Sequence, residues 1–249
     1  MEALVASDRT LAASRLVNRP LYLQVRDALI ERIGKGEWSP GAAIPNEVDL
    51  AREFGISSGT MRKALDLLET ERVLTRSQGR GTYINDQSSA ALVSRFWRIS
   101  AADGKPMNGD AKTIEIVEAP ANEEECRRLR LGAQDCVYRV RRARWHGDRP
   151  FVVEEASLPA VLFPGLLERN GIDHRIVALA QLYGILLGKA DERITIAAAP
   201  PAIADSLRVA SSTAVMLLDR LLFTLDGQPV EWRVAHCHLR GGFYRADMG

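Results

Sequence analysis

The spacing of apolar residues over the first third of the chain predicts three helices. Apolar side chains recur every four positions over residues 21–33, which is the spacing of one buried helix face, and two glycines follow to end that helix. A second short helix begins after Asn46, a residue type suited to the N-cap position. A third helix is expected over residues 58–71, after a tight turn at 55–57.

The third helix is two-faced, and a small hairpin follows it. Its apolar residues lie at i, i+3, i+4 and i+7 and are expected to pack on the other helices: Met61, Ala64, Leu65 and Leu68. The opposite face carries small and charged residues, among them Ser58, Arg62 and Lys63. Extended segments at 73–76 and 82–85 flank the turn residues 78–81 and predict a hairpin with a glycine-rich tip.

These features suit a DNA-binding head. Two helices joined by a three-residue turn form a helix-turn-helix motif, whose second helix enters the major groove. Small residues at the start of that helix let the backbone approach phosphates, and Arg62 has the reach to bind a guanine edge. Arg80, between two glycines, can lie along the DNA backbone or enter a minor groove. The periodicity alone equally fits a small helical domain with a solvated charged face.

Residues 20–84 resemble the DNA-binding head of the GntR family of bacterial regulators. The matching segments are PLYLQVRDALIERI, GEWSPGAAIPNEVDLAREFGISSGTMRKALDLLE and RSQGRGTYI. The resemblance implies that five residues contact DNA: Thr60, Arg62, Arg80, Gly81 and Thr82. The starts of the helix and of the hairpin tip add four further candidates: Ser57, Ser58, Lys63 and Gln78. Because Val48 and Ser58 stand where the family usually carries arginines, the operator sequence cannot be taken over from relatives.

Beyond a polar linker at residues 87–94 the pattern changes to strands mixed with short helices. Strands are expected at 112–117, 136–145, 151–158, 193–198, 214–224 and 230–239, and helices at 122–131, 174–183 and 202–209. Asn122 begins the first of these helices as its N-cap, followed by an acidic first turn. The two strands around residues 146–148 are expected to pair in a hairpin, and so are the last two strands.

A repeated pattern runs through this half. Arg142, Gly147 and Pro150 recur in the same order as Arg220, Gly227 and Pro229, at a nearly constant offset along the chain, and each set follows the end of a predicted helix. We interpret the pattern as an internal duplication, with two helix-plus-hairpin units sharing one antiparallel sheet. Chance similarity of two hairpins is the alternative.

One strand of the first repeat carries the candidate ligand site. Arg142 and Arg144 lie on the same strand face as Tyr138 and Val140. Arginines that continue an apolar face need an anionic partner if they are buried, and a carboxylate or phosphate ligand would provide one. Glu154, on the partner strand, could then bind an amine or hydroxyl of the ligand. An internal Arg–Glu ion pair, or arginines that reach solvent, would also explain the pattern.

Residues 95–245 resemble the UTRA domain of the HutC-type branch of the GntR family, which shares its fold with chorismate lyase. The closest segments are YRVRRAR at 138–144, PFVVE at 150–154, DGQPVE at 226–231 and RGGFY at 240–244. The resulting candidate effector-binding residues are Arg142, Arg144, Glu154, Arg175 and Tyr244. Gly242 and Phe243 stand where the family usually carries an acid and a base, which changes one wall of the expected pocket.

Composition limits the remaining functions. The formal net charge is +1, so DNA binding has to come from a local basic patch. No apolar run is long enough to span a membrane, and nothing in the N-terminal residues resembles a signal peptide. The three cysteines are widely spaced and favour a reducing cytoplasm. His236 and His238 alternate on one strand, but no cysteine or acid completes a metal site, and no cofactor motif is present.

The sequence therefore predicts an α+β protein with four segments. These are a disordered tail at 1–18, a winged helix-turn-helix domain at 19–86, the linker at 87–94, and a mixed, mainly antiparallel sheet domain at 95–249. The expected function is a cytoplasmic, homodimeric transcription regulator, favouring a repressor, that binds an inverted-repeat operator and responds to an anionic or zwitterionic metabolite. The alternatives are an enzyme that retains lyase-type chemistry and a constitutive DNA-binding protein without an effector.

Overall fold

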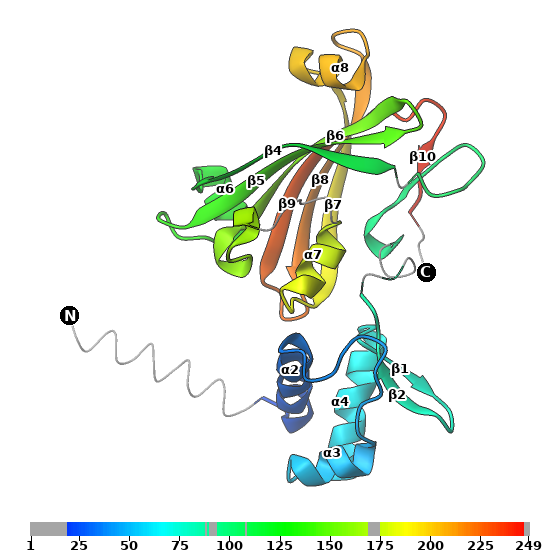
Figure 1. Ribbon diagram of the computed structural model, residues 1–249, viewed down its shortest axis with the longest axis vertical. Coiled ribbons are helices and arrows are strands. Elements are labelled where there is room, and N and C mark those ends of the chain that lie inside the picture. Colours follow the sequence, from blue (N-terminus) through cyan, green and yellow to red (C-terminus); the bar gives the residue numbers. More distant parts are fainter. Residues whose placement is uncertain (1–18, 88, 90–93, 108, 169–174, 247–249) are drawn as a thin grey trace, which may run out of the picture. The chain divides into compact units, whose positions relative to one another are not determined.

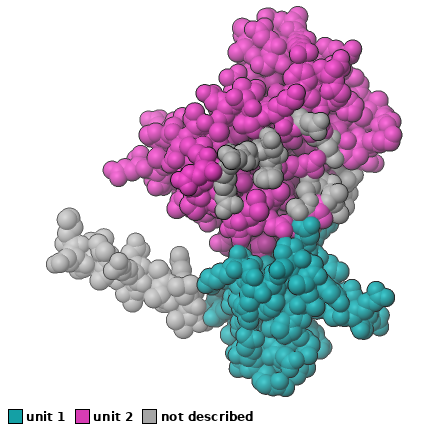
Figure 2. Space-filling model, in the orientation of Figure 1, with its two compact units in different colours: residues 1–86 teal, residues 87–249 magenta. Residues whose placement is uncertain are grey.

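The chain forms two compact units, residues 1–86 and residues 87–249 (Figure 2). The computed structural model describes residues 19–87, 89, 94–107, 109–168 and 175–246. The expected tail at 1–18 and most of the expected linker at 87–94 lie outside the described residues.

Over residues 19–86, the described part of the first unit, the chain forms three helices and a two-stranded sheet (Figure 1). Their bounds are α2 Leu21–Gly34, α3 Glu47–Glu53, α4 Ser58–Thr70, β1 Leu74–Ser77 and β2 Gly81–Ile84. The predicted helices and hairpin are therefore confirmed to within one residue at each end. The helices pack around a core to which each contributes its apolar face, including Leu29, Leu50, Met61, Leu65 and Leu68, all buried.

Local capping fixes the ends of the helices in the helix-turn-helix motif. Asn46 Oδ1 accepts a hydrogen bond from the backbone N–H of Asp49 at 3.0 Å, as expected of an N-cap. Ser57 Oγ accepts one from the N–H of Thr60 at 3.2 Å. Between the two helices Gly55 adopts φ +64°, a left-handed conformation that glycine takes up without strain. These contacts explain why the sequence alone located this turn.

A six-stranded sheet forms the centre of the second unit (Figure 1). Its strands are β4 Asp110–Pro120, β5 Cys136–His146, β6 Arg149–Pro159, β7 Leu187–Ala198, β8 Ala214–Thr224 and β9 Pro229–Cys237. They lie in the order β4-β5-β6-β9-β8-β7. Every pairing between described strands is antiparallel, so this sheet is antiparallel throughout and not mixed.

The two faces of the sheet carry different helices. On one face α8 (Pro201–Leu207) packs on Ala143 and Val153, and α6 (Glu123–Leu129) lies on the same side, since Glu125 bonds Ser157. On the other face α7 (Ile176–Leu182) and the 3-10 turns η2 (Ala160–Leu162) and η3 (Leu166–Glu168) cover the apolar part of β5. The second face also carries the candidate ligand site.

The sheet has the two-fold arrangement that an internal duplication predicts. Each half consists of a strand, a short helix and a hairpin: β4-α6-β5-β6 and β7-α8-β8-β9. Both helices end on an arginine in the left-handed conformation, Arg130 at φ 56° and Arg208 at φ 54°. The halves meet where β6 pairs with β9, and there Glu155 lies opposite Val234. These two residues have the same separation along the chain as Pro150 and Pro229, so equivalent residues face each other across a local two-fold axis.

Some boundaries in the second unit were wrong. β7 begins at Leu187 and not at 193, because its first half is polar and exposed at the sheet edge and so lacks an apolar alternation. α6 ends at Leu129 and not at 131, because Arg130 leaves the helical conformation. β9 ends at Cys237, so His238 lies beyond the strand. The sequence also missed η1 (Ser94–Phe96) and a separate two-stranded sheet of β3 (Ile99–Ser100) and β10 (Phe243–Tyr244).

The helices of the described residues are short. α6, α7 and α8 have seven residues each, and α2 has 14. Over the part of the chain that the structure describes, no helix combines the length and apolar character needed to cross a bilayer.

Candidate functional site

The exposed face of α4 brings together most of the head's candidate DNA-contacting residues. Ser58, Arg62 and Lys63 are exposed, and Thr60 is half-buried. Ser57 lies at the N-cap, where its hydroxyl holds the backbone of Thr60 and lies 2.9 Å from the Thr60 hydroxyl. The first two turns of α4 therefore present small polar groups and two cations on one surface, opposite the residues that pack in the core.

Arg62 is held by an acidic residue of the preceding helix. Its Nη2 lies 2.9 Å from Glu47 Oε1, and its Nε donates to both carboxylate oxygens at 3.1 and 3.2 Å. The hydrogen bond to Glu47 raises the pKa of Arg62 above its ordinary value. Glu47 contacts Nε and Nη2, so a DNA group can bind Arg62 through Nη1 or compete with Glu47 for the other donors. Sequence reasoning missed the pair because its members lie on different helices.

The hairpin tip presents the remaining candidates of the head. Gly79 and Gly81 have φ values of 72° and 115°, so both sides of Arg80 use backbone conformations that favour glycine. The Tyr83 hydroxyl donates to the Arg80 carbonyl at 2.8 Å and holds the tip closed. Gln78, Arg80 and Gly81 are exposed and Thr82 is half-buried, which makes the tip a compact wing with one exposed cation.

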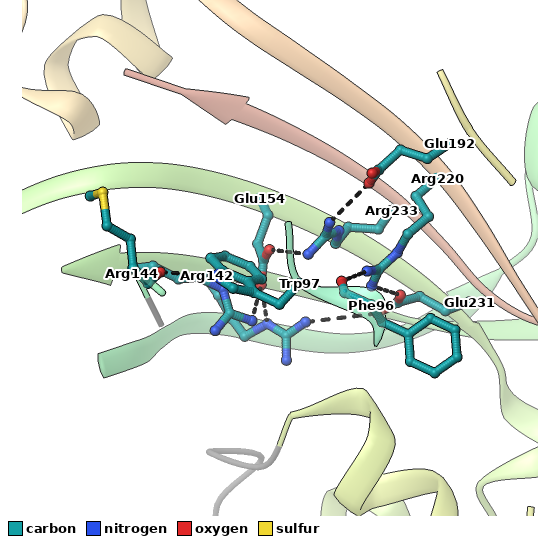
Figure 3. A network of polar contacts seen from close by, with 10 residues as sticks. Phe96, Trp97, Arg142, Arg144, Glu154, Glu192, Arg220, Glu231 and Arg233 are labelled. Carbon is teal, nitrogen blue, oxygen red and sulfur yellow. Dashed lines mark hydrogen bonds and ion pairs between the residues drawn. The ribbon is translucent and has the colours of Figure 1, made fainter. Parts of the chain in front are cut away.

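Buried charged side chains cluster on one face of the six-stranded sheet (Figure 3). They are Arg142 and Arg144 on β5, Glu154 on β6, Arg220 on β8, and Glu231 and Arg233 on β9. Strand register explains the cluster, because Cα partners across a sheet point their side chains to the same face. Arg142 is opposite Glu154, and Arg220 is opposite Arg233. The cluster thus lies across the local two-fold axis, with members from both repeats.

Glu154 is the acceptor at the centre of the cluster. Arg144 Nη2 donates to its Oε1 at 2.9 Å, and Arg233 Nη1 donates to its Oε2 at 3.1 Å. Arg142 Nε lies 3.1 Å from the same Oε1. Burial alone would raise the pKa of Glu154, but the charges of the three arginines outweigh burial and hold this pKa well below its usual range. Glu154 is therefore a carboxylate in the folded protein.

The second repeat supplies its own ion pairs. Arg220 donates to Glu231 Oε2 at 2.7 Å and to the Phe96 carbonyl at 2.6 Å. Arg233 also bonds Glu192 on β7, at 3.5 Å. Burial and the neighbouring charge of Arg233 lower the pKa of Arg220. Among the described residues, four arginines thus share three carboxylates on this face, so this part of the cluster carries one excess positive charge.

A cavity of about 30 Å³, with room for one or two water molecules, adjoins the cluster. Phe96 and Trp97 border it from one side, and Arg175 and the start of α7 from another. The Trp97 ring covers the guanidinium of Arg144 at 4.7 Å, which shields that charge from water.

The five candidate effector residues differ in their position relative to this cavity. Arg142, Arg144 and Arg175 line the cavity directly. Glu154 is fully buried among the arginines and is not among the lining residues. Tyr244 is also not a lining residue, but its hydroxyl donates to Glu192 at 2.5 Å and so joins the cluster through a carboxylate. Its pKa is raised, by burial first and by Glu192 second.

Sequence reasoning missed half of the cluster, although a signal was present. Arg220 is the repeat equivalent of Arg142. Because the two hairpins are equivalent in the repeat, the candidate site on the first hairpin also indicated the second hairpin as part of the same site. Glu192 carried no such signal, because it lies in the polar half of β7 that the sequence did not identify as a strand.

The histidines and cysteines form no metal centre in the described residues. His236 is on β9, whereas His238 lies past its end, and burial lowers the pKa of both side chains. No group of three or more His, Cys, Asp or Glu side chains among the described residues is placed to hold a metal ion. Burial raises the pKa of the Cys237 thiol to about 12.

Comparison with known families defines the class of protein. Residues 21–84 match the model of the gntR family of bacterial regulatory proteins, and residues 104–240 match the UTRA domain. The chain therefore belongs to the GntR family of bacterial regulators, in the branch that joins a helix-turn-helix head to a UTRA domain. The resemblances found in the two halves of the sequence are both confirmed.

The individual relatives are transcription regulators as well. The chain is 34% identical over 153 residues to MngR, the mannosyl-D-glycerate transport/metabolism system repressor of Escherichia coli, a match that covers 60% of this chain and 62% of MngR. It is 28% identical to the transcriptional repressor NagR of Bacillus subtilis, over 85% of this chain and 88% of NagR. The ligand-binding domain of a GntR-family regulator from Bordetella bronchiseptica superposes with a TM-score of 0.56 at 25% identity, covering 62% of this chain and 98% of that domain.

Proposed function

We propose that the protein is a homodimeric transcription repressor that releases its operator when a small anionic or zwitterionic metabolite occupies the effector domain. The start of α4 and the wing tip bind the operator, and the buried arginine cluster binds the metabolite. Because its target is chromosomal DNA, the protein acts in the cytoplasm. The excess of buried positive charge beside the cavity is the observation that carries the effector class.

That excess charge favours an anion over a neutral ligand. A buried cation that lacks a counter-charge is costly, and a bound carboxylate or phosphate would neutralise it. Three buried guanidinium atoms, Nε of Arg144, Arg220 and Arg233, have no hydrogen-bond partner among the described residues. These N–H groups are donors that an anion can use. Buried Glu231 Oε1 likewise has no hydrogen-bond partner there and can accept from an amine or hydroxyl of the same ligand.

The MngR relative agrees with this class of ligand. MngR is named for a mannosyl-D-glycerate system, and the glycerate group of that compound carries a carboxylate and a hydroxyl. A ligand of that type combines an anion for the arginines with hydroxyls for Glu231. We therefore place hydroxylated carboxylates and phosphorylated sugars first among the effector candidates.

The position of Phe96 and Trp97 suggests how occupancy reaches the head. Both border the cavity, and both lie early in the second unit, a short way along the chain from Asp86, the last residue of the first unit. A metabolite is larger than this cavity, so it has to displace Phe96, the start of α7, or both in order to enter fully. Displacing Phe96 breaks the hydrogen bond from Arg220 to its carbonyl and shifts the segment that leads to the head. A ligand that prefers the shifted arrangement therefore alters how the two heads are held.

A ligand screen coupled to DNA release tests this function. The full chain is screened by thermal shift against hydroxylated carboxylates, amino acids and sugar phosphates, and each stabilising compound is then added to the protein–operator complex. We expect a stabilising anion that lowers operator affinity about 5- to 150-fold and that is recovered chemically unchanged. Turnover of the compound would indicate an enzyme, and the absence of any stabilising compound would favour a constitutive DNA-binding protein.

Arg175→Ala locates the effector in the arginine-lined cavity. Arg175 lines the cavity at the N-cap of α7 and is half-buried, so its removal is expected to spare the fold while weakening the effector at least 10-fold. Arg127→Ala, at an exposed position on α6, is the matched control. Unchanged effector affinity in Arg175→Ala would place the ligand elsewhere.

The second unit also offers a surface for the homodimer. β7 is an edge strand, and it exposes Ile194 and Ile196, which are 42% and 73% accessible. Apolar side chains on an unpaired edge favour association with a second copy. Light scattering is expected to give twice the chain mass of 27.5 kDa at micromolar concentration, and Ile196→Lys to shift the protein towards the monomer. A monomeric parent in the presence of operator would contradict the dimer.

A further inference from the structure

A second, larger cavity lies in the effector domain. It measures about 220 Å³ and is formed where the β5–β6 hairpin turns, beside the chain that follows β9 and the segment after β3. Its apolar wall includes Phe151, Met107 and Leu239. It shares no lining residue with the arginine-lined cavity of the proposed effector site.

Two aromatic rings separate the cavities. Phe151 lines the larger one, and its ring meets the edge of Trp97 at a centroid distance of 6.4 Å with an interplanar angle of 89°. Trp97 lines the smaller cavity and is anchored by a hydrogen bond from its Nε1 to the Met107 carbonyl, at 2.9 Å. The Trp97–Phe151 pair therefore borders a different cavity on each side. A ligand can occupy the larger cavity without any change in the arginine cluster.

The volume fits a ring with a short substituent. A dry apolar cavity of about 150 Å³ is large enough to bind benzene. The cavity of about 220 Å³ therefore accommodates a six-membered ring and one small polar group without rearrangement. His146 already meets Phe151 edge-to-face, at a centroid distance of 6.4 Å, so the wall presents ring surfaces against which another ring can pack.

The basic side chains around the cavity favour an anionic group on the ligand. Four basic side chains line it: His146, Arg149, His238 and Arg240. Of the described residues that line it, none is acidic. Two carboxylates that follow or precede lining residues in the sequence are paired: Asp103 with Lys105 at 3.1 Å, and Asp148, on the exposed hairpin turn, with Arg149 at 3.9 Å.

His238 is arranged as a donor. Arg240 Nε donates to His238 Nδ1 at 3.2 Å, which leaves the proton of a neutral His238 on Nε2. The same hydrogen bond fixes the Arg240 guanidinium at the cavity. A carboxylate in the cavity would therefore meet an imidazole N–H and at least one guanidinium group, while the ring attached to it packs on the apolar wall.

We propose that this cavity is a second ligand site, which binds a small carboxylate carried on a six-membered ring. The site is independent of the proposed effector site, because the two cavities are lined by different residues and are divided by the Trp97–Phe151 pair.

Benzoate titrated into the full chain tests the proposal. Methionine methyl groups are labelled with ¹³C, so that Met107 reports on the cavity and Met61, in the core of the head, is an internal reference. We expect saturable binding in the millimolar range or tighter, with nuclear Overhauser contacts between the benzoate ring and the Met107 methyl. Benzamide, which has the same shape without the charge, is expected to bind at least 10-fold more weakly.

Two exposed variants separate charge recognition from loss of fold. Arg240→Gln is expected to weaken benzoate at least 10-fold with unchanged methionine spectra of the free protein. Arg127→Gln, at an exposed position on α6, is expected to leave binding as in the parent. The proposal is overturned if benzoate gives no contact with Met107 up to 10 mM. It is equally overturned if benzamide binds as well as benzoate, or if Arg240→Gln binds like the parent.

Discussion

Replacing Arg62 by alanine is expected to weaken operator binding roughly 30- to 20,000-fold while leaving stability almost unchanged. A base-edge contact contributes about 1–3 kcal/mol, and a homodimer makes it twice, so the loss amounts to about 2–6 kcal/mol. The Arg62 side chain is 66% accessible and packs on nothing in the core, so its removal creates no cavity. Fluorescence anisotropy measures the effect, at fixed salt, on an operator that the parent has selected from random-sequence DNA.

The ion pair with Glu47 provides a second variant whose effect has the opposite sign. Glu47→Gln releases Arg62 and removes a negative charge from the DNA-facing surface, so operator affinity is expected to rise several-fold.

For Arg62→Ala the control is Lys35→Ala, which removes an exposed cation at the end of α2 and so tests for a general effect of lost positive charge. If Arg62→Ala binds the operator within two-fold of the parent at matched salt, α4 is not the recognition helix.

The head was predictable because its signals are local. The cap at Asn46, the glycine turn at Gly55 and the apolar face of α4 each depend on residues within one or two helical turns. The structure places these elements within a residue of the expected bounds. The Arg62–Glu47 pair was not predictable in this way, because it depends on how α3 and α4 cross and not on either helix alone.

The effector site was predictable only in part because it is assembled from distant strands. The alternation along β5 correctly placed Arg142 and Arg144 on the face of Tyr138 and Val140. The strand next to β6 in the sheet is β9, which lies far along the chain. No local sequence pattern predicts that these two strands pair. The internal repeat was the one long-range signal in the sequence, and it pointed to Arg220.

Removing the Glu154 carboxylate is the change expected to destabilise the effector domain most. Glu154→Ala leaves Arg142, Arg144 and Arg233 buried without the acceptor they share, which costs about 3–5 kcal/mol. For a chain of this size that corresponds to a fall in Tm of roughly 6–20 °C. Glu155→Ala is the matched control, because the neighbouring side chain is exposed on the opposite face of β6.

The pH dependence of this loss has a definite sign. The folded-state pKa of Glu154 is held below its unfolded value, so its contribution to stability is complete well above the unfolded pKa of about 4.3. It is lost as the pH falls below that value towards the folded pKa. The difference in Tm between parent and Glu154→Ala is therefore expected to be constant from pH 8 to about pH 6 and to shrink below about pH 4.

Acetate is expected to restore much of the stability that Glu154→Ala loses. The atoms deleted in this variant, one methylene and the carboxylate, match acetate in size and charge, and the three arginines that bound them remain in place. An anion that binds only the folded state raises Tm with concentration by mass action. We expect acetate at about 100 mM to raise the Tm of the variant more than that of the parent, compared with chloride at the same ionic strength. If acetate has no more effect than chloride, the buried arginines do not form a receptor for carboxylates, and the cluster is a structural ion-pair network.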